Sequence, residues 1–193
     1  SKINSDGSLG GWSATTPLPS EQGRATHAII AANGFLYDIG GYRNTTIMGN
    51  IWRAPIRPDG SVGTWIAESP LPVPLYRATA VTRNNVLYVI GGRPSTTAVS
   101  RRIFQAPVLT SGSLGDWGDL GDVFPEGRPD HVSLIDGNLL FVIGGTNGAV
   151  MRQTVFTFRV ETNLTPMPPG TPLPTPRVRA AGILNDRHDV YII

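Results

Sequence analysis

One pattern of polar and apolar residues recurs along the chain. It has Asn or Asp at a turn, followed by a nearly continuous run of apolar and aromatic residues. Three copies end in two glycines, at 33–41, 84–92 and 136–145, and a fourth at 185–193 stops before the glycine pair. Asn-Gly and Asp-Gly favour tight hairpin turns, and a continuous apolar run favours a strand buried on both faces. Each copy therefore predicts a turn, a buried strand and a backbone bend at the glycines.

A second pattern ends in tryptophan. Short turns rich in Gly and Ser lead to Trp12, Trp65 and Trp117, which lie 53 and 52 residues apart. Asp-Gly between alternating residues is a strong hairpin signal, so each turn predicts a hairpin with an outer strand. We expect the three indoles to be largely buried between sheets, at equivalent places.

Two further strands complete each period. One begins at a recurring arginine, over 24–32, 77–82, 128–135 and 177–184, and its many small residues suit a crowded inner position. The other covers 51–56, 103–108 and 155–160. Two of its three copies contain a proline, which favours an outer position because the residue lacks a ladder donor. Proline-bounded connectors such as Pro17-Leu18-Pro19 carry the chain from one period to the next.

The spacing predicts the architecture. A period near 51 residues with four strands is typical of a β-propeller, in which each repeat is one blade. We expect an all-β segment of about four blades of four antiparallel strands, forming one domain over 1–193. The predicted blades are approximately 24–70, 77–120, 128–170 and an incomplete 177–193, and residues 1–19 form the outer strand and connector of a preceding blade.

These motifs together resemble the kelch repeat. The match consists of Arg24-x-x-His27-Ala28, the Asn33-Gly34 turn with its following Leu-Tyr-x-Ile-Gly-Gly, and the Asp-Gly-Ser turn before Trp65. The resemblance covers essentially the whole chain and is closest to galactose-oxidase-like propellers of bacterial surfaces. It implies a kelch-type propeller that usually closes with six or seven blades. We therefore expect an incomplete ring, completed by further blades or by another subunit.

Composition limits the chemistry. The formal charge is only +2, so the overall field gives no reason to expect nucleic acid, and no apolar run is long enough to span a bilayer. The chain has no cysteine, which excludes thiolate metal sites and the cysteine-tyrosine cofactor of galactose oxidase. No catalytic residue, metal site or cofactor is predicted. His27 and His131 occupy nearly equivalent inner positions, so a structural role explains them, and a shared metal is the alternative.

The recurring arginines are the most suggestive residues. Arg24, Arg77, Arg128 and Arg177 follow the period and enter the inner strands from one side. Their guanidinium groups could bind carboxylates, sulfate or sugar acids, or they could bind carbonyls of the neighbouring blade and stabilise the ring. We favour the second interpretation, because a residue repeated in every blade serves the repeat more often than a ligand, and ligand binding is the alternative. Residues outside the repeat are better candidates for a partner surface, namely Tyr42, Trp52, Tyr76 and Arg93.

An acidic stretch replaces the proline connector of the third period. Its carboxylates, from Asp116 to Asp130, could bind Ca²⁺ or act on a glycoside, but their spacing matches no EF-hand loop and a solvated loop explains them.

The leading hypothesis is a non-enzymatic scaffold that binds protein or glycan through loops on one face, in an extracellular or cell-envelope protein. The alternatives are a propeller domain of a glycan-active enzyme and a subunit of a filament or large assembly.

Overall fold

The computed structural model describes residues 1–19, 23–161 and 163–193, and these residues form strands, turns and loops without any helix. The first sheet has the order β1-β2-β5-β6, with β1 Ala28–Ala32, β2 Phe35–Ile39, β5 Ile51–Pro55 and β6 Ile66–Glu68. The second has the order β7-β8-β9-β10, with β7 Tyr76–Arg83, β8 Val86–Arg93, β9 Arg102–Pro107 and β10 Gly118–Asp122. The third has the order β11-β12-β13-β14, with β11 Val132–Asp136, β12 Leu139–Ile143, β13 Val155–Val160 and β14 Leu164–Pro166.

Two small sheets remain. Strands β3 Tyr42–Arg43 and β4 Thr46–Ile47 form a hairpin within the connection from β2 to β5, and β15 Gly182–Leu184 pairs with β16 Val190–Ile192. Every pairing in the sheets is antiparallel. The prediction of four-stranded antiparallel blades is confirmed for three complete blades, followed by the inner two strands of a fourth.

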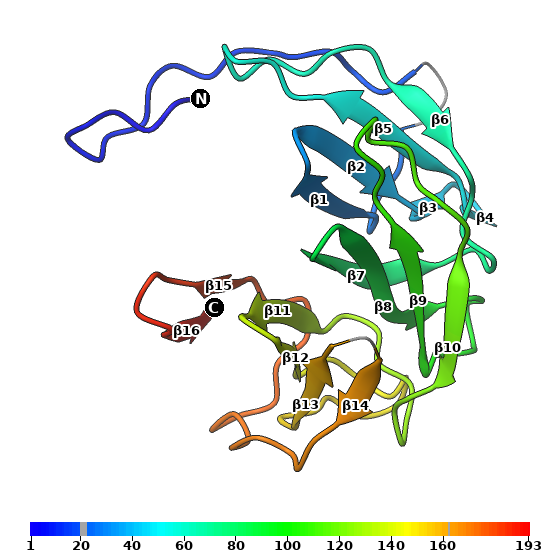
Figure 1. The fold of residues 1–193 in the computed structure, drawn as a ribbon. Helices are drawn as coiled ribbons and strands as arrows, with labels where there is room; N and C mark the ends of the chain where they lie inside the picture. Colours follow the sequence, from blue (N-terminus) through cyan, green and yellow to red (C-terminus); the bar gives the residue numbers. More distant parts are fainter. Residues whose placement is uncertain (20–22, 162) are drawn as a thin grey trace.

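The sheets form an open arc (Figure 1). Strands β1, β7, β11 and β15 line its inside in sequence order, and β6, β10 and β14 lie on its outside. The N-terminal hairpin and the β15–β16 hairpin face the gap at the two ends of the arc. Strands β15 and β16 pair with each other and with no other described strand. The described chain is therefore an incomplete ring, as the sequence predicts.

The predicted turns have the backbone that their residues favour. Asn33 and Gly34 join β1 to β2 with φ of 49° and 78°, a left-handed pair that matches the twist of a two-residue hairpin. The strands that follow are the most buried ones. All positions of β8 from Leu87 to Gly92 are buried, since this strand has a blade on each side.

The glycine pair connects each blade to the next. The second glycine donates its amide to a carbonyl from the next blade: Gly41 to Leu75 at 2.8 Å, Gly92 to Arg128 at 3.2 Å and Gly145 to Arg177 at 2.7 Å. The first glycine packs against the same carbonyl, and a Cβ on Gly40, Gly91 or Gly144 would lie 2.4, 2.3 or 2.7 Å from it. Only glycine tolerates both this approach and the positive φ found there.

A chain of backbone hydrogen bonds runs along the inner ends of the blades. Arg77 N donates to Thr26 O at 2.9 Å, Asp130 N to Arg77 O at 3.1 Å and Arg179 N to Asp130 O at 2.9 Å. All four residues are left-handed, with φ of 55° to 59°. This conformation turns each backbone toward the next blade, and three of the four inner strands begin only after it. Strands β1, β11 and β15 begin several residues after Arg24, Arg128 and Arg177.

The repeat register differs from the prediction at one arginine. Arg24 and Arg128 each lie 16 residues before the first glycine of their pair, and the residue at that position in the second blade is Leu75, not Arg77. Arg77 corresponds instead to Thr26, Asp130 and Arg179 in the left-handed chain. The spacing of the arginines did not reveal this shift, because Arg77 lies only two residues after Leu75, the position at which the repeat predicts an arginine.

The tryptophans are less buried than predicted. Trp65 and Trp117 are partly buried, and their Nε1 atoms donate to Thr16 O at 3.0 Å and Ser69 O at 3.3 Å in the preceding connector. Trp12 is 82% exposed, so the prediction is wrong for this residue. Trp65 and Trp117 lie 49 and 48 residues after the connector residues whose carbonyls they bind. Among the described residues, no such connector carbonyl is present for Trp12.

The core lies between blades. One apolar cluster, around Leu87 and Phe104, fills the seam of the first and second blades, and another, around Ile90 and Phe158, fills the seam of the second and third. At the ends of the arc, large apolar residues are exposed instead, among them Ile29 at 55%, Tyr191 at 51% and Ile193 at 86%. Each blade thus buries its faces only against its neighbours.

Two glycines test the seam contact. We expect Gly91→Ala to lower the free energy of unfolding by more than about 3 kcal/mol, because positive φ and a carbonyl clash act together. Gly137→Ala is the matched control, since Gly137 has a similar φ of 53° and open space around its Cβ position, and should cost about 1 kcal/mol. Urea unfolding of both variants measures the difference. Equal losses would show that φ alone requires glycine.

The indoles provide a second test. Trp65→Ala should cost about 2–3 kcal/mol, below the range for a fully buried Trp, because the side chain is half-buried but hydrogen-bonded. Trp12→Ala should stay within about 0.5 kcal/mol of the wild type. Denaturant unfolding checks both, and a large loss at Trp12 would contradict its exposure.

Candidate functional site

Three loops gather on one face of the arc. They connect the second and third strands of each complete blade, over 40–50, 94–101 and 144–154. Because the strands are antiparallel, the connectors between blades and the starts of the inner strands lie at the same end. We call this side the loop face. The opposite side, with the turns at 33–34, 84–85, 136–138 and 185–188, is the turn face.

Arg24 lies inside the first blade. Its side chain is fully buried, and Nη1 donates to Gly40 O at 2.9 Å and Asn50 O at 3.0 Å. Its Nε lies 3.7 Å from a carboxylate oxygen of Asp38, which is also buried. Burial lowers the pKa of Arg24 and raises that of Asp38, while the opposite charge of each partner counteracts the shift. The carbonyls belong to Arg24's own blade, not to its neighbour as predicted.

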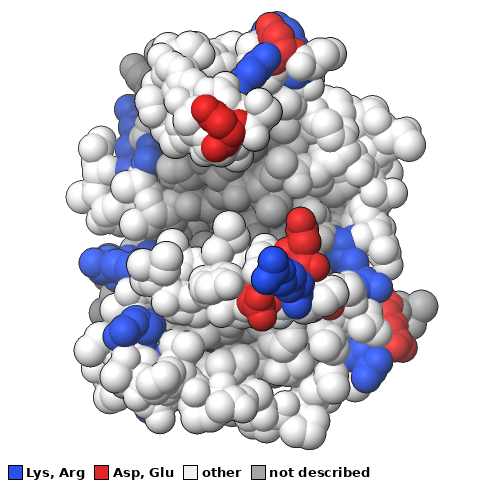
Figure 2. Space-filling view, turned by 90° about the vertical axis from the view of Figure 1, so that its left-hand side faces the viewer, with Lys and Arg blue, Asp and Glu red and all other residues white. Residues whose placement is uncertain are grey.

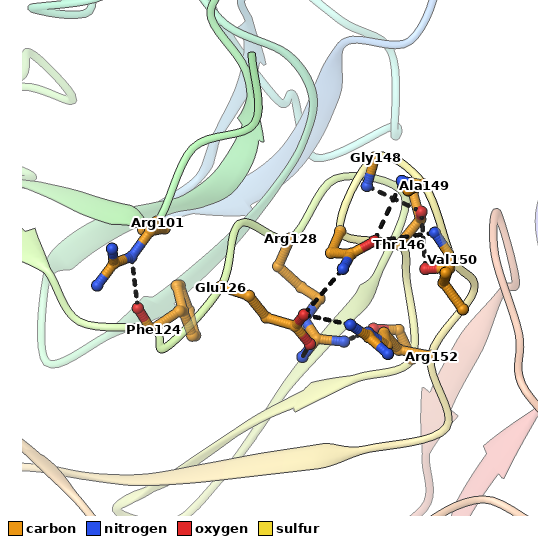
Figure 3. A network of polar contacts seen from close by, with 11 residues as sticks. Arg101, Phe124, Glu126, Arg128, Thr146, Gly148, Ala149, Val150 and Arg152 are labelled. Atoms are coloured by element: carbon orange, nitrogen blue, oxygen red, sulfur yellow. Dashed lines mark hydrogen bonds and ion pairs between the residues drawn. The ribbon is translucent and has the colours of Figure 1, made fainter. Parts of the chain in front are cut away.

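Arg128 occupies the equivalent place in the third blade (Figure 3). Its buried guanidinium donates to Gly144 O at 3.2 Å and to Glu126 at 2.9 Å, and it lies 4.6 Å from the ring centroid of Phe156. The other oxygen of Glu126 accepts from Asn147 at 3.1 Å and Arg152 at 2.5 Å. This network connects the loop over 144–154 to the connector.

The carboxylate of Glu126 compensates two arginines. Burial acts to raise its pKa, but the hydrogen bond from Arg152 and the charge of Arg128 together hold the pKa below its ordinary value. Glu126 is therefore an ionised counter-ion rather than a general acid. The loop over 146–150 is held further by its own polar contacts, including Gly148 N to Thr146 Oγ1 at 3.0 Å.

A row of side chains crosses the loop face from the first blade to the fourth. The rings of Tyr42 and Tyr76 lie 5.3 Å apart, and Arg77 lies 5.4 Å from the Tyr76 ring. Asp130, 7% exposed, accepts from Arg77 at 3.1 Å and Arg179 at 3.3 Å. We call these five residues the Asp130 row. It brings together three predicted site residues and adds two that sequence reasoning did not assign to a site.

The other predicted residues lie apart from this row. Arg177 is exposed, and its carbonyl bonds Gly145. Arg93 donates to Thr96 O at 3.0 Å within its own loop. Trp52 is partly buried opposite Asp38 on β5. The binding roles predicted for these residues stay predictions.

Most carboxylates of the acidic stretch take part in separate ion pairs with arginines. Asp119 and Asp122 contact Arg102, while Glu126 and Asp130 each bridge two other arginines. No group of three or more His, Asp or Glu that could hold a metal occurs among residues 1–19, 23–161 and 163–193. The alternation of acids with Arg128 at 126–130 is the one sequence signal that could have revealed these pairs.

Charge is distributed unevenly. Away from the outer pairs of Arg101 and Arg102, the described loop face carries two carboxylates, Glu126 and Asp130. The partly exposed or exposed arginines there are Arg43, Arg77, Arg93, Arg152, Arg177 and Arg179. Figure 2 looks into the open side of the arc: Lys and Arg without acidic neighbours line its left edge, whereas acidic and basic side chains stand together at the top, near the centre and at the right. The loop face is therefore the basic side.

His131 is buried on the inside of the arc, where small residues line a shallow cavity of about 260 Å³. Its Nε2 lies 2.7 Å from Thr79 Oγ1, which also donates to Ser133 at 2.7 Å. Burial lowers the pKa of His131 to about 3, and the charge of Arg128 contributes. His27 lies at the equivalent position beside Gly41. The imidazole of His131 is thus a neutral structural group that links two blades.

This burial predicts a pH dependence. Between pH 6.5 and about 3 the unfolded chain binds a proton at His131 and the folded chain does not, so stability falls as the pH falls through this window. The slope from this group is about 1.4 kcal/mol per pH unit. His131→Gln should flatten the curve of unfolding free energy against pH by that amount. Parallel curves for the two proteins would contradict the buried neutral histidine.

Comparison with known proteins agrees with this fold. No family model matches the chain. It is 34% identical over 88 residues to Kelch-like protein 38 of Mus musculus, covering 45% of this chain and 15% of that protein. It is 31% identical over 147 residues to Kelch domain-containing protein 10 of Xenopus tropicalis, covering 70% of this chain and 34% of that protein. The chain thus spans about a third or less of the length of these relatives.

A solved structure, that of YjhT, superposes with a TM-score of 0.72 at 13% identity, over 91% of this chain and 60% of that one. No helix that could cross a membrane is found in the part of the chain that the structure describes. The recurring glycine pairs, the four-stranded antiparallel blades and these relatives together identify the chain as part of a kelch-repeat β-propeller.

Proposed function

We propose that this propeller segment is a non-enzymatic scaffold whose loop face binds an acidic segment of a partner protein. The observation that carries the proposal is the Asp130 row, in which one nearly buried carboxylate is shared by Arg77 and Arg179. One carboxylate cannot neutralise two guanidinium groups. The row therefore keeps a positive charge, with Arg179 65% exposed.

The chemistry of the row suits an acidic peptide. Arginine forms charge-assisted and bidentate hydrogen bonds to carboxylates, and exposed arginine beside tyrosine is typical of residues that dominate protein interfaces. Tyr42 and Tyr76 supply aromatic surface at one end of the row, and the exposed Arg177 precedes Arg179 by two residues in the sequence. The turn face carries both signs of charge and has no corresponding aromatic pair among the described residues.

Support for a scaffold rather than an enzyme comes from how the carboxylates are used. Glu126, Asp130 and Asp38 are each paired with arginine, and His131 is neutral and inside the arc. Glycan contact through the same arginines is the second ligand class, and the extracellular or envelope location expected from the resemblance stays a prediction.

Selection of peptides tests the proposal. A random peptide library is selected on the folded protein, and the affinities of the enriched peptides are measured for the wild type and for Arg177→Gln/Arg179→Gln. We expect enrichment in Asp and Glu and a loss of about tenfold or more in the double variant, since each charged hydrogen bond contributes roughly 1.5–3 kcal/mol.

Arg57→Gln/Arg187→Gln on the turn face is the matched control, because it removes the same charge from exposed residues. Its affinities should stay within about twofold of the wild type. Enriched peptides without an excess of Asp and Glu would contradict the acidic ligand. Equal losses of affinity in the two double variants would show that the loop face is not the binding surface.

A further inference from the structure

Asp130 is held at the centre of the Asp130 row by its side chain and by its backbone. Its carboxylate has Oδ2 3.1 Å from Nη1 of Arg77 and Oδ1 3.3 Å from Nε of Arg179. Its amide donates to Arg77 O at 3.1 Å, and its carbonyl accepts from Arg179 N at 2.9 Å. The carboxylate is therefore fixed between a guanidinium of the second blade and one of the fourth.

The two arginines keep hydrogen-bond donors that Asp130 does not use. A guanidinium presents several N–H groups in a planar fork, and each arginine gives Asp130 one hydrogen bond rather than a bidentate pair. Both side chains reach solvent, at 27% exposure for Arg77 and 65% for Arg179. Since the place between them is filled, a ligand meets two separate sets of donors, one on each side of Asp130.

The internal carboxylate acts against a ligand that has a single acidic group. Such a group cannot enter between the two guanidinium groups, and beside either arginine it is repelled by the negative charge of Asp130. Two acidic groups, one at each arginine, instead form two sets of charge-assisted hydrogen bonds, which outweigh this repulsion. Asp130 thus favours ligands that carry two acids.

An extended peptide can place two acids in this way. Its side chains alternate between two sides, and residues i and i+2 lie on the same side about 6.6 Å apart. This spacing allows one acid on each side of the Asp130 carboxylate. Adjacent acids point to opposite sides of an extended chain, so only one of them faces the row.

We propose that Asp130 determines the specificity of the loop face by acting as an internal competitor, so that the ligand is an extended segment with acidic residues at positions i and i+2. This inference rests on the proposed function and adds which acidic segments the loop face accepts.

The test uses three capped seven-residue peptides of Gly and Ser that differ only in their acids. One has a single Asp, one has Asp-Ser-Asp and one has Asp-Asp. Their binding to the whole chain is measured by calorimetry at about 50 mM salt, where charges are weakly screened. For the wild type we expect the Asp-Ser-Asp peptide to bind about tenfold more tightly than the single-acid peptide and about threefold more tightly than the Asp-Asp peptide.

Asp130→Asn removes the competing charge and keeps the shape of the side chain, and Asn tolerates the left-handed φ of 59° found there. The single-acid peptide should bind this variant about tenfold more tightly than it binds the wild type. Asp122→Asn is the matched control, because Asp122 also lies near two arginines, Arg101 at 3.7 Å and Arg102 at 3.6 Å. It should leave all three affinities unchanged. Thermal unfolding checks that both variants are folded.

The comparison of peptides on the wild type needs no variant. Equal binding of all three peptides would overturn the specificity while leaving acid binding by the loop face intact. An unchanged or weaker affinity of well-folded Asp130→Asn for the single-acid peptide would overturn the role of Asp130. No binding of any peptide to either protein up to about 5 mM would contradict the proposed function itself, and this inference with it.

Discussion

The contact between a glycine of one blade and a carbonyl of the next is the constraint on which the arc depends. At Gly40, Gly91 and Gly144 the two backbones approach so closely that a Cβ would lie within 2.7 Å of the carbonyl oxygen. The neighbouring amide then bonds the same carbonyl. Since side chains are excluded from this contact, the spacing of blades is set by backbone atoms alone. The apolar seams can then vary in sequence without changing the curvature of the arc.

A buried arginine in this seam requires a counter-ion, and the chain supplies it from different places. Asp38 on a strand compensates Arg24, whereas Glu126 on a connector compensates Arg128. The second blade avoids the requirement altogether, because Leu75 stands at the same position. An ion removed from water is tolerated only when it is paired and hydrogen-bonded, so each repeat satisfies one electrostatic rule in its own way. The differences between repeats then give each seam its own local chemistry.

The same backbone also shapes the candidate binding surface. The left-handed residues Thr26, Arg77, Asp130 and Arg179 connect successive blades through their amides and carbonyls. Their side chains therefore emerge at one level on the loop face, where Asp130 meets the arginines on either side. A structural device of the repeat thus places charged groups from three blades within reach of one ligand. The charged part of this surface lies at repeat positions, whereas Tyr42 and Tyr76 at its end lie outside the repeat.

The sequence by itself determined the antiparallel blades, the turns at Asn33-Gly34 and its equivalents, and the kelch-type repeat, because these features depend on local residue preferences and on a regular period. It could not place Trp12 at the surface, since burial depends on which blade is adjacent. The spacing of the arginines did not distinguish Arg77 from Arg128, but the distance to the glycine pair does, because Arg128 lies 16 residues before Gly144 and Arg77 lies 14 residues before Gly91. Only the tertiary structure decided that Arg24 and Arg128 are internal while Arg77 and Arg179 meet at Asp130. The burial and the ion-pair partner of each arginine depend on distances between blades, and these distances cannot be read from residue spacing along the chain.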